Sequence, residues 1–238
     1  MSGSSHLGID DPVCPARGRI NDIIASRGED TERAYDAWAQ YFDEDMITLG
    51  YGGYDVMGKN VIKFVTNKNA KILDVGCGTG LFGEKLRSLG YMNIFGVDAS
   101  DSFLEKSREK GVYLELEEHR FGNGLKLPYS DNSFDVIMAV SILGPNTINP
   151  TALYELDGLL SPGGYLMIFI RRSRLDMERE NFNVKAVLDD LLTSGRWERL
   201  PDSSGLYYTQ PNGVPVAEGD EAVEGDGVVV TMKKLLKH

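Results

Sequence analysis

The chain has 238 residues, of which 42% are apolar and 26% charged, and its formal net charge is −11. This length suits one large α/β domain or two small ones, and the composition is that of a chain that can bury a core. The acidic balance argues against binding to nucleic-acid phosphates, because such binding rests on clustered Lys and Arg. Small molecules or proteins are therefore favoured as partners. No apolar run approaches about 18 residues, so no membrane span is expected.

The first residues have neither the basic nor the apolar segment of a secretory signal, which predicts a cytoplasmic protein. The two cysteines, Cys14 and Cys77, support neither a disulfide scaffold nor a metal cluster. Residues 1–28 combine Gly, Ser, Pro and scattered charge without apolar periodicity, and this pattern predicts a flexible N-terminal arm outside the fold. Residues 29–238 are expected to form a single domain.

Apolar residues first recur at helical spacing after position 31, in Tyr35, Trp38, Phe42 and Met46. They predict an amphipathic helix whose other positions are acid-rich. The glycine-rich residues 50–54 end this helix, and a second helix is predicted over residues 56–66.

Short apolar runs then alternate with amphipathic segments. Strands are predicted at 71–75, 93–97, 113–116, 134–140 and 164–170, with helices at 81–89, 102–110 and 149–160. Uninterrupted apolar strands in this alternation predict a parallel sheet covered on both faces, with ligands at the carboxyl ends of the strands. A last helix at 184–192 and β-rich segments at 197–209 and 227–235 follow, and residues 211–226 are predicted to form an exposed acidic loop.

Three glycines at alternate positions follow the first predicted strand, in the run Asp74-Val75-Gly76-Cys77-Gly78-Thr79-Gly80. Such a turn lets a ligand lie against bare backbone near a helix N-terminus. The dinucleotide fingerprint G-x-G-x-x-G would place its third glycine at residue 81, which is Leu81. Asp74 would also stand beside a pyrophosphate, so a cationic or amino-bearing ligand suits this loop better. A nicotinamide-dependent oxidoreductase is the less favoured alternative.

The next predicted strand ends at Asp98, where a carboxylate can accept hydrogen bonds from both hydroxyls of a ribose. Together, these segments resemble the class I S-adenosylmethionine-dependent methyltransferases. Residues 74–80 look like the first motif of that family, and Asp98 matches its ribose-binding acid. Asn123 stands where relatives commonly have an Asp at the adenine edge. Residues 35–43 and 192–198 are similar to the Williams-Beuren-region methyltransferase-like proteins.

The resemblance implies a Rossmann-like fold, with a mostly parallel seven-stranded twisted sheet, helices on both faces and an antiparallel C-terminal strand. It implies S-adenosyl-L-methionine as the cofactor and no metal. It divides the domain into a helical cap at 29–66, a cofactor-binding core at 67–170 and a substrate-side half at 171–238. The cofactor-binding residues that it implies are Tyr35, Asp74, Gly76, Cys77, Gly78, Thr79, Gly80, Asp98, Ala99, Asn123, Gly124, Val140 and Ser141.

The resemblance further implies in-line methyl transfer, for which a small-molecule acceptor is expected and a protein acceptor is the alternative. Ser141 and Tyr35 are candidates at the methyl-facing rim, and Arg171, at the end of the fifth strand, can bind an acidic substrate. His119 has charged neighbours on both sides and is predicted to be a solvated loop residue. A non-catalytic cofactor-binding module that acts through protein partners is the alternative from another class.

Overall fold

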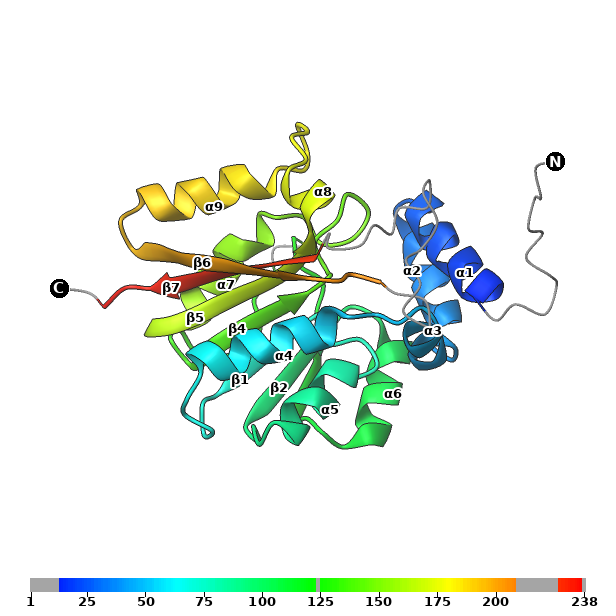
Figure 1. Ribbon diagram of the computed structural model, residues 1–238, viewed down its shortest axis with the longest axis horizontal. Coiled ribbons are helices and arrows are strands. Elements are labelled where there is room, and N and C mark those ends of the chain that lie inside the picture. The colour runs from blue at the N-terminus through cyan, green and yellow to red at the C-terminus, as the bar shows by residue number, and fades with distance from the viewer. Residues whose placement is uncertain (1–12, 123–124, 209–226, 237–238) are drawn as a thin grey trace, which may run out of the picture.

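A computed structural model describes residues 13–122, 125–208 and 227–236 of the chain (Figure 1). The strands are β1 (Ile72–Val75), β2 (Ile94–Asp98), β3 (Glu115–Glu118), β4 (Phe134–Val140), β5 (Leu160–Arg171), β6 (Trp197–Gly205) and β7 (Gly227–Lys234). Within the described residues they form one sheet of seven strands in the order β3-β2-β1-β4-β5-β7-β6.

The five strands β1 to β5 pair in parallel, whereas β7 is antiparallel to both β5 and β6. The order places β1 between β2 and β4, so the chain reverses its direction of winding at β1. A reversal of this kind opens a crevice outside the carboxyl ends of the strands. The predicted fold class, a mostly parallel sheet with antiparallel strands at the C-terminus, is confirmed.

Helices cover both faces of the sheet (Figure 1). The helices are α1 (Val13–Ala25), α2 (Glu29–Trp38), α3 (Phe42–Thr48), α4 (Gly53–Phe64), α5 (Leu81–Ser88), α6 (Asp101–Lys110), α7 (Ala152–Leu159), α8 (Arg172–Leu175) and α9 (Val184–Thr193). The alternate side chains of each strand point to opposite faces. One set packs on α4 and α5, and the other packs on α7 and α9. No helix in the described ranges is long and apolar enough to cross a bilayer.

The expectation of an unstructured arm over residues 1–28 is wrong for residues 13–25, which form α1. Ala16 and Ile23 are buried in a small core with Trp38 and Met46. Together with Ile20, these two residues follow the helical spacing i, i+4, i+7, a period that was not recognised beside the helix-breaking Pro15 and Gly18. Residues 1–12 and the predicted acidic loop at 211–226 lie outside the described residues.

The single helix predicted from Thr31 onward is two helices, because the chain turns between Trp38 and Phe42. Asp45 on α3 stabilises this turn, since its carboxylate accepts hydrogen bonds from the Trp38 indole at 2.7 Å and from the Arg19 guanidinium at 2.6 Å. Helices α1, α2 and α3 therefore form one cap, which lies at the carboxyl end of the sheet in Figure 1.

Two further elements differ from the sequence prediction. Leu160, predicted to be the last residue of a helix, begins β5, and the Ser161-Pro162-Gly163-Gly164 turn belongs to that strand. The short helix α8 was not predicted, because four residues are too few to show a helical period. Because the chain turns into α8 directly after β5, Arg174 on this helix lines the crevice.

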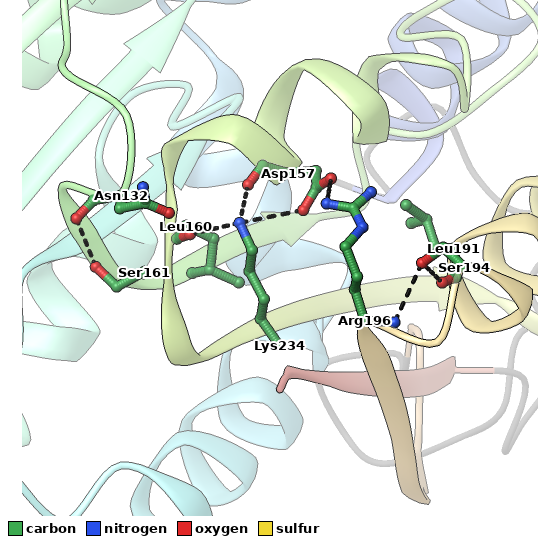
Figure 2. A network of polar contacts seen from close by, with 8 residues as sticks. All are labelled: Asn132, Asp157, Leu160, Ser161, Leu191, Ser194, Arg196 and Lys234. Carbon is green, nitrogen blue, oxygen red and sulfur yellow. Dashed lines mark hydrogen bonds and ion pairs between the residues drawn. The ribbon is translucent and has the colours of Figure 1, made fainter. Parts of the chain in front are cut away.

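The amino end of the sheet holds a buried ion pair (Figure 2). The Lys234 ammonium donates to the carbonyl oxygens of Asp157 at 2.6 Å and Leu160 at 2.8 Å, and lies 3.2 Å from the Asp157 carboxylate. The Arg196 guanidinium approaches the same carboxylate at 2.7 Å. These contacts join the end of α7, the start of β5 and the ends of β6 and β7, at the edge opposite the crevice.

Candidate functional site

A cavity of about 620 Å³ lies at the carboxyl ends of the parallel strands. Its walls come from the loops after β1, β2, β3 and β4, from the end of β5, from the cap helices and from Tyr207 and Tyr208. This is where open α/β sheets bind ligands, and the volume falls within the range of roughly 300–1,000 Å³ that is usual for ligand pockets. The cavity is therefore the candidate functional site.

The glycine loop after β1 forms the floor of this cavity. Gly76 and Gly78 have left-handed backbone conformations, with φ of 67° and 56°. The amides of Gly76 and Cys77 both donate to the Val97 carbonyl, which fixes the loop against β2. A side chain at Gly76 would collide with Ile142 at 2.2 Å, whereas a Cβ on Gly78 would have nothing within 4 Å. Bare backbone at Gly78 thus faces open space, as contact with a bulky ligand requires.

Asp98, at the end of β2, is held in one orientation by the backbone. One carboxylate oxygen accepts the Gly78 amide at 2.8 Å, and the other accepts the Ser100 amide at 3.0 Å. Burial raises the pKa of Asp98, and these backbone hydrogen bonds oppose the rise. A carboxylate has about four acceptor sites, so lone pairs remain for two ligand hydroxyls.

Asp74 lies beneath the same loop and is almost completely buried, with 1% of its surface exposed. Its carboxylate accepts a hydrogen bond from the Tyr113 hydroxyl at 2.7 Å. Burial raises the pKa of Asp74 to about 7, the hydrogen bond from Tyr113 lowers it, and the charge of Asp98 raises it slightly further. An acid in this state takes up or loses a proton according to the charge of its ligand.

Ser141, directly after β4, has a left-handed backbone with φ of 61°. This conformation is unfavourable for a residue with a Cβ, and such strain gathers at functional sites. The Tyr51 hydroxyl lies 2.6 Å from the Ser141 hydroxyl, and the Ser141 amide donates to the Phe169 carbonyl at 2.8 Å. Burial raises the pKa of Tyr51 well above its usual value, so this phenol stays protonated, and either hydroxyl of the pair can be the donor.

Aromatic rings form the wall around this hydroxyl pair. The Tyr51 ring lies 4.7 Å from Tyr54, 5.4 Å from Tyr207 and 5.5 Å from Tyr208, measured between centroids. The Arg171 guanidinium lies over the rings of Tyr207 and Tyr208, at 4.4 Å and 5.3 Å from their centroids. This end of the cavity therefore offers flat apolar surface together with cationic charge.

The cap helices close the cavity beside the glycine loop. Tyr35 and Trp38 on α2 line it, and Tyr35 also packs edge-on against Phe103 at 5.8 Å. Polar contacts connect cap and core: the Ser100 hydroxyl donates to Asp36 at 2.7 Å, and the Thr79 hydroxyl donates to Asp43. The cap is thus attached near the ends of β1 and β2, where it shields a bound ligand from water.

Most of the predicted site residues meet in this one cavity. Those that line it are Tyr35, Asp74, Gly76, Cys77, Gly78, Asp98, Ala99, Val140, Ser141 and Arg171. Thr79 and Gly80 do not line it, because the Thr79 side chain is turned toward Asp43 and Gly80 is the N-cap of α5. Asn123 and Gly124 lie outside the described residues.

The prediction that His119 is solvated is wrong. Its exposed fraction is 9%, its ring packs edge-on against Phe121 at 4.8 Å, and it lines the cavity. Within the described ranges its Nε2 has no hydrogen-bond partner, and burial lowers its pKa. The charged neighbours in the sequence concealed this burial, because Glu118 and Arg120 on either side are exposed whereas His119 is buried.

Other lining residues were missed as well. They include Tyr51, Tyr54, Arg174, Tyr207 and Tyr208. The aromatic residues of the Gly50–Tyr54 run and the adjacent pair Tyr207-Tyr208 were a usable signal, but nothing local in the sequence shows that the two segments meet. They do so through an isolated antiparallel bridge between Tyr51 and Tyr208.

Comparisons with known proteins agree with this geometry. Residues 73–168 match the family model of a methyltransferase domain. Methyltransferase-like protein 27 of Homo sapiens is 32% identical over 168 residues, which is 70% of this chain and 67% of that protein. Demethylmenaquinone methyltransferase of Staphylococcus aureus (strain MRSA252) is 29% identical over 144 residues, which is 58% of this chain and 59% of that enzyme. The match thus spans less than two thirds of the second relative.

Two solved structures share the fold. The [4+2]-cyclase SpnF superposes with a TM-score of 0.62 at 19% identity, covering 90% of this chain and 98% of that chain. A Burkholderia thailandensis 1,6-didemethyltoxoflavin-N1-methyltransferase with bound S-adenosylhomocysteine has a TM-score of 0.54 at 14% identity, covering 84% and 86%.

The fold, the glycine loop and the two carboxylates define a Rossmann-like nucleoside-binding enzyme. The chain belongs to the class I S-adenosylmethionine-dependent methyltransferases, and S-adenosylmethionine is its cofactor. Within that class it is similar to methyltransferase-like protein 27.

Proposed function

We propose that this chain transfers the methyl group of S-adenosylmethionine to a small molecule that binds at the aromatic end of the cavity. The observation that carries the proposal is that a single cavity is lined both by Gly78 and Asp98 and by Ser141, Tyr51 and Tyr207. A site with room for a ligand beside the cofactor loop, under a cap of helices, suits a compact acceptor better than a segment of a folded protein.

The residues of the glycine loop fit the cofactor. Asp98 is oriented to accept the ribose hydroxyls, and the open backbone at Gly78 gives room for the nucleoside. Asp74 is a buried carboxylate with a raised pKa, and it becomes fully ionised beside a cationic amino group. Tyr35 covers the site from the cap. When bound, S-adenosylmethionine supplies a methyl group that its positive sulfonium has already activated.

The protein then has to position the acceptor, which alone can supply about 7–11 kcal/mol of a reaction barrier. Ser141 and Tyr51 are suited to this task, because their hydroxyls are fixed by their mutual hydrogen bond and by the buried backbone of Ser141. Neither group is a base at neutral pH, since the Tyr51 phenol stays protonated. The acceptor atom therefore enters as a neutral nucleophile or after loss of its own proton to water.

The relatives support a small acceptor. One is named for demethylmenaquinone and another for 1,6-didemethyltoxoflavin, and both names refer to organic molecules that contain a ring system. These names describe those proteins. For this chain the same class of acceptor fits the aromatic wall of Tyr51, Tyr54, Tyr207 and Tyr208.

The test is a metabolite extract incubated with the protein and methyl-labelled S-adenosylmethionine. We expect labelled products of low molecular mass, and we expect Asp98→Ala to reduce them at cofactor concentrations near the dissociation constant of the wild type. A label that enters only protein would replace this proposal by a protein methyltransferase. Tight binding of S-adenosylhomocysteine without any transferred label would replace it by a non-catalytic cofactor-binding module.

A further inference from the structure

Most charges around the cavity are separated by sign, and the exception is Arg120, which pairs with Glu32 on the acidic side. The acids gather on the cofactor side: Asp74 and Asp98 lie at the glycine loop, and Asp36 and Glu32 lie on α2 of the cap. Each of these acids has a partner, which is Tyr113 for Asp74, backbone amides for Asp98, Ser100 for Asp36 and Arg120 for Glu32. This half of the cavity therefore suits the cationic amino and sulfonium groups of the cofactor.

The other side of the cavity is cationic. Arg171 and Arg174 both line it, from the end of β5 and from α8. Both guanidinium groups lie close enough to favour ionisation of the Tyr208 phenol by lowering its pKa, and Arg174 acts on Tyr35 in the same way. Burial outweighs this influence and keeps both phenols protonated, so neither phenol supplies a negative charge.

Of the two arginines on this side of the cavity, Arg174 is the one without a contact that holds its guanidinium, as far as the described residues show. Within the described ranges it makes neither an ion pair nor a hydrogen bond through its guanidinium. Arg171, in contrast, lies over Tyr207 and Tyr208, which hold its guanidinium in place. Arg174 is half-buried and packs beside Gly144. A Cβ on Gly144 would lie 2.9 Å from the Nη1 of Arg174. Its position is therefore limited by the loop after β4.

A partly buried guanidinium without an anion loses hydration and gains little in return. Arginine is also the residue best suited to bind a carboxylate through two parallel hydrogen bonds. From these observations we propose that the acceptor is a planar ring compound that carries a carboxylate, with the carboxylate bound by Arg174 and the ring packed against the tyrosine wall. This inference rests on the proposed function and specifies the class of its substrate.

The position of the acids disfavours the reverse orientation. A carboxylate near the glycine loop would face Asp74 and Asp98, whereas one at Arg174 would face a guanidinium. The ring is thereby directed so that its far edge, and not its carboxylate, points toward the Ser141 and Tyr51 hydroxyls. The same dipolar cavity selects against acceptors with a positive charge.

The experiment measures binding to the full chain saturated with S-adenosylhomocysteine. The probes are hydroxy-, amino- and mercapto-substituted benzoates and naphthoates, each paired with its neutral carboxamide of the same shape. Isothermal titration calorimetry gives the affinity of each pair for the wild type, for Arg174→Gln and for Arg174→Lys. The matched control is Arg172→Gln, because Arg172 lies on the same short helix but is exposed and does not line the cavity.

We expect the best-bound carboxylates to bind the wild type at least tenfold more tightly than their carboxamides. Arg174→Gln should remove that ratio, Arg174→Lys should keep part of it, and Arg172→Gln should leave it unchanged. Equal affinity for acids and amides, the absence of binding by either series, or a ratio that survives Arg174→Gln would each overturn the inference. The wild-type comparison needs no variant to fold, and the binding of S-adenosylhomocysteine reports the folding of each variant.

Failure of this inference is distinguishable from failure of the proposed function. If neutral metabolites acquire label from the methyl donor, and Arg174→Gln leaves that labelling intact, the enzyme methylates small molecules but does not select them by a carboxylate. If label enters only protein or is not transferred at all, the proposed function itself is wrong. Labelled products that retain an anionic group, and that disappear with Arg174→Gln, support both.

Discussion

The two ends of the sheet satisfy their charges in opposite ways. At the amino end the buried Lys234 has two carbonyl oxygens and the Asp157 carboxylate as partners (Figure 2). At the carboxyl end Asp74 has a raised pKa, Ser141 has a strained backbone and Arg174 has no acid within the described ranges. Raised carboxylate pKa values and backbone strain are enriched at functional sites, so they favour the carboxyl end as the functional end.

The largest effect should come from breaking the completed end. Asp157→Ala would leave the buried Lys234 ammonium without its carboxylate, and removing one partner of a buried pair typically destabilises by about 3–5 kcal/mol. The two carbonyl hydrogen bonds to Lys234 remain, so we expect about 3 kcal/mol in denaturant unfolding. The affinity for S-adenosylhomocysteine should not change below the unfolding transition. A variant that lost cofactor affinity without losing stability would contradict the separation of the two ends.

The reverse pattern is expected for Asp98→Ala. The substitution removes the acceptor of the Gly78 and Ser100 amides and the proposed acceptor of the ribose hydroxyls, so cofactor affinity should fall by about 1–3 kcal/mol. Calorimetric titration with S-adenosylhomocysteine measures this loss. Glu105→Ala is the control, because this exposed acid on α6 lies outside the cavity. Equal losses of cofactor affinity in both variants would show that Asp98 acts only through the net charge of the protein and not through a specific contact.

The sequence predicted the half of the site whose residues end or directly follow strands of the sheet. The glycine loop and Asp98 each follow a strand directly, so local spacing places them at the same edge of the sheet. The aromatic and cationic half was mostly missed, because Tyr51, Arg174 and Tyr207 come from segments that meet only in the folded chain. Arg171 was predicted because it ends a strand, by the same logic that located Asp98.

The secondary-structure elements show the same difference between features that local sequence predicts and features that depend on tertiary contacts. Each central strand and its helix were predicted within a few residues, because a continuous apolar run and a helix-ending glycine are local signals. Helix α1 was missed because its stability depends on contacts with α2 and α3, such as the pairing of Arg19 with Asp45. The helical spacing of Ala16, Ile20 and Ile23 was not recognised beside Pro15 and Gly18, and only the tertiary contacts show that the segment is a helix.

Cofactor binding should depend on pH through Asp74. Burial raises its pKa to about 7, above its value in the unfolded chain, so the protonated form is the one that the unliganded fold favours. That contribution to stability is complete below about pH 3.8 and is lost as the pH rises through about 7. A cationic amino group favours the carboxylate instead, so affinity for S-adenosylhomocysteine should fall by about tenfold per pH unit below 7.

Calorimetry in buffers of different ionisation enthalpy checks this dependence, because binding near pH 7 should release a proton from Asp74. Asp74→Asn should bind more weakly at pH 8 and should lose the pH dependence between 6 and 8. A pH profile that Asp74→Asn leaves unchanged would assign the titration to another group, and His119, which lines the same cavity, would be the next residue to substitute.

The smallest effect that we predict comes from Tyr51→Phe. The variant removes one hydroxyl from the pair with Ser141 and keeps the ring that packs on Tyr54 and Tyr207. A hydrogen bond of this kind contributes about 0.5–1.5 kcal/mol, so kcat for the labelled product should fall by about fivefold with little change in stability or cofactor affinity. Tyr41→Phe is the matched control, since Tyr41 is 42% exposed and does not line the cavity. If Tyr51→Phe raised KM alone, the hydroxyl pair would only bind the acceptor, whereas a fall in kcat shows that it positions the acceptor for transfer.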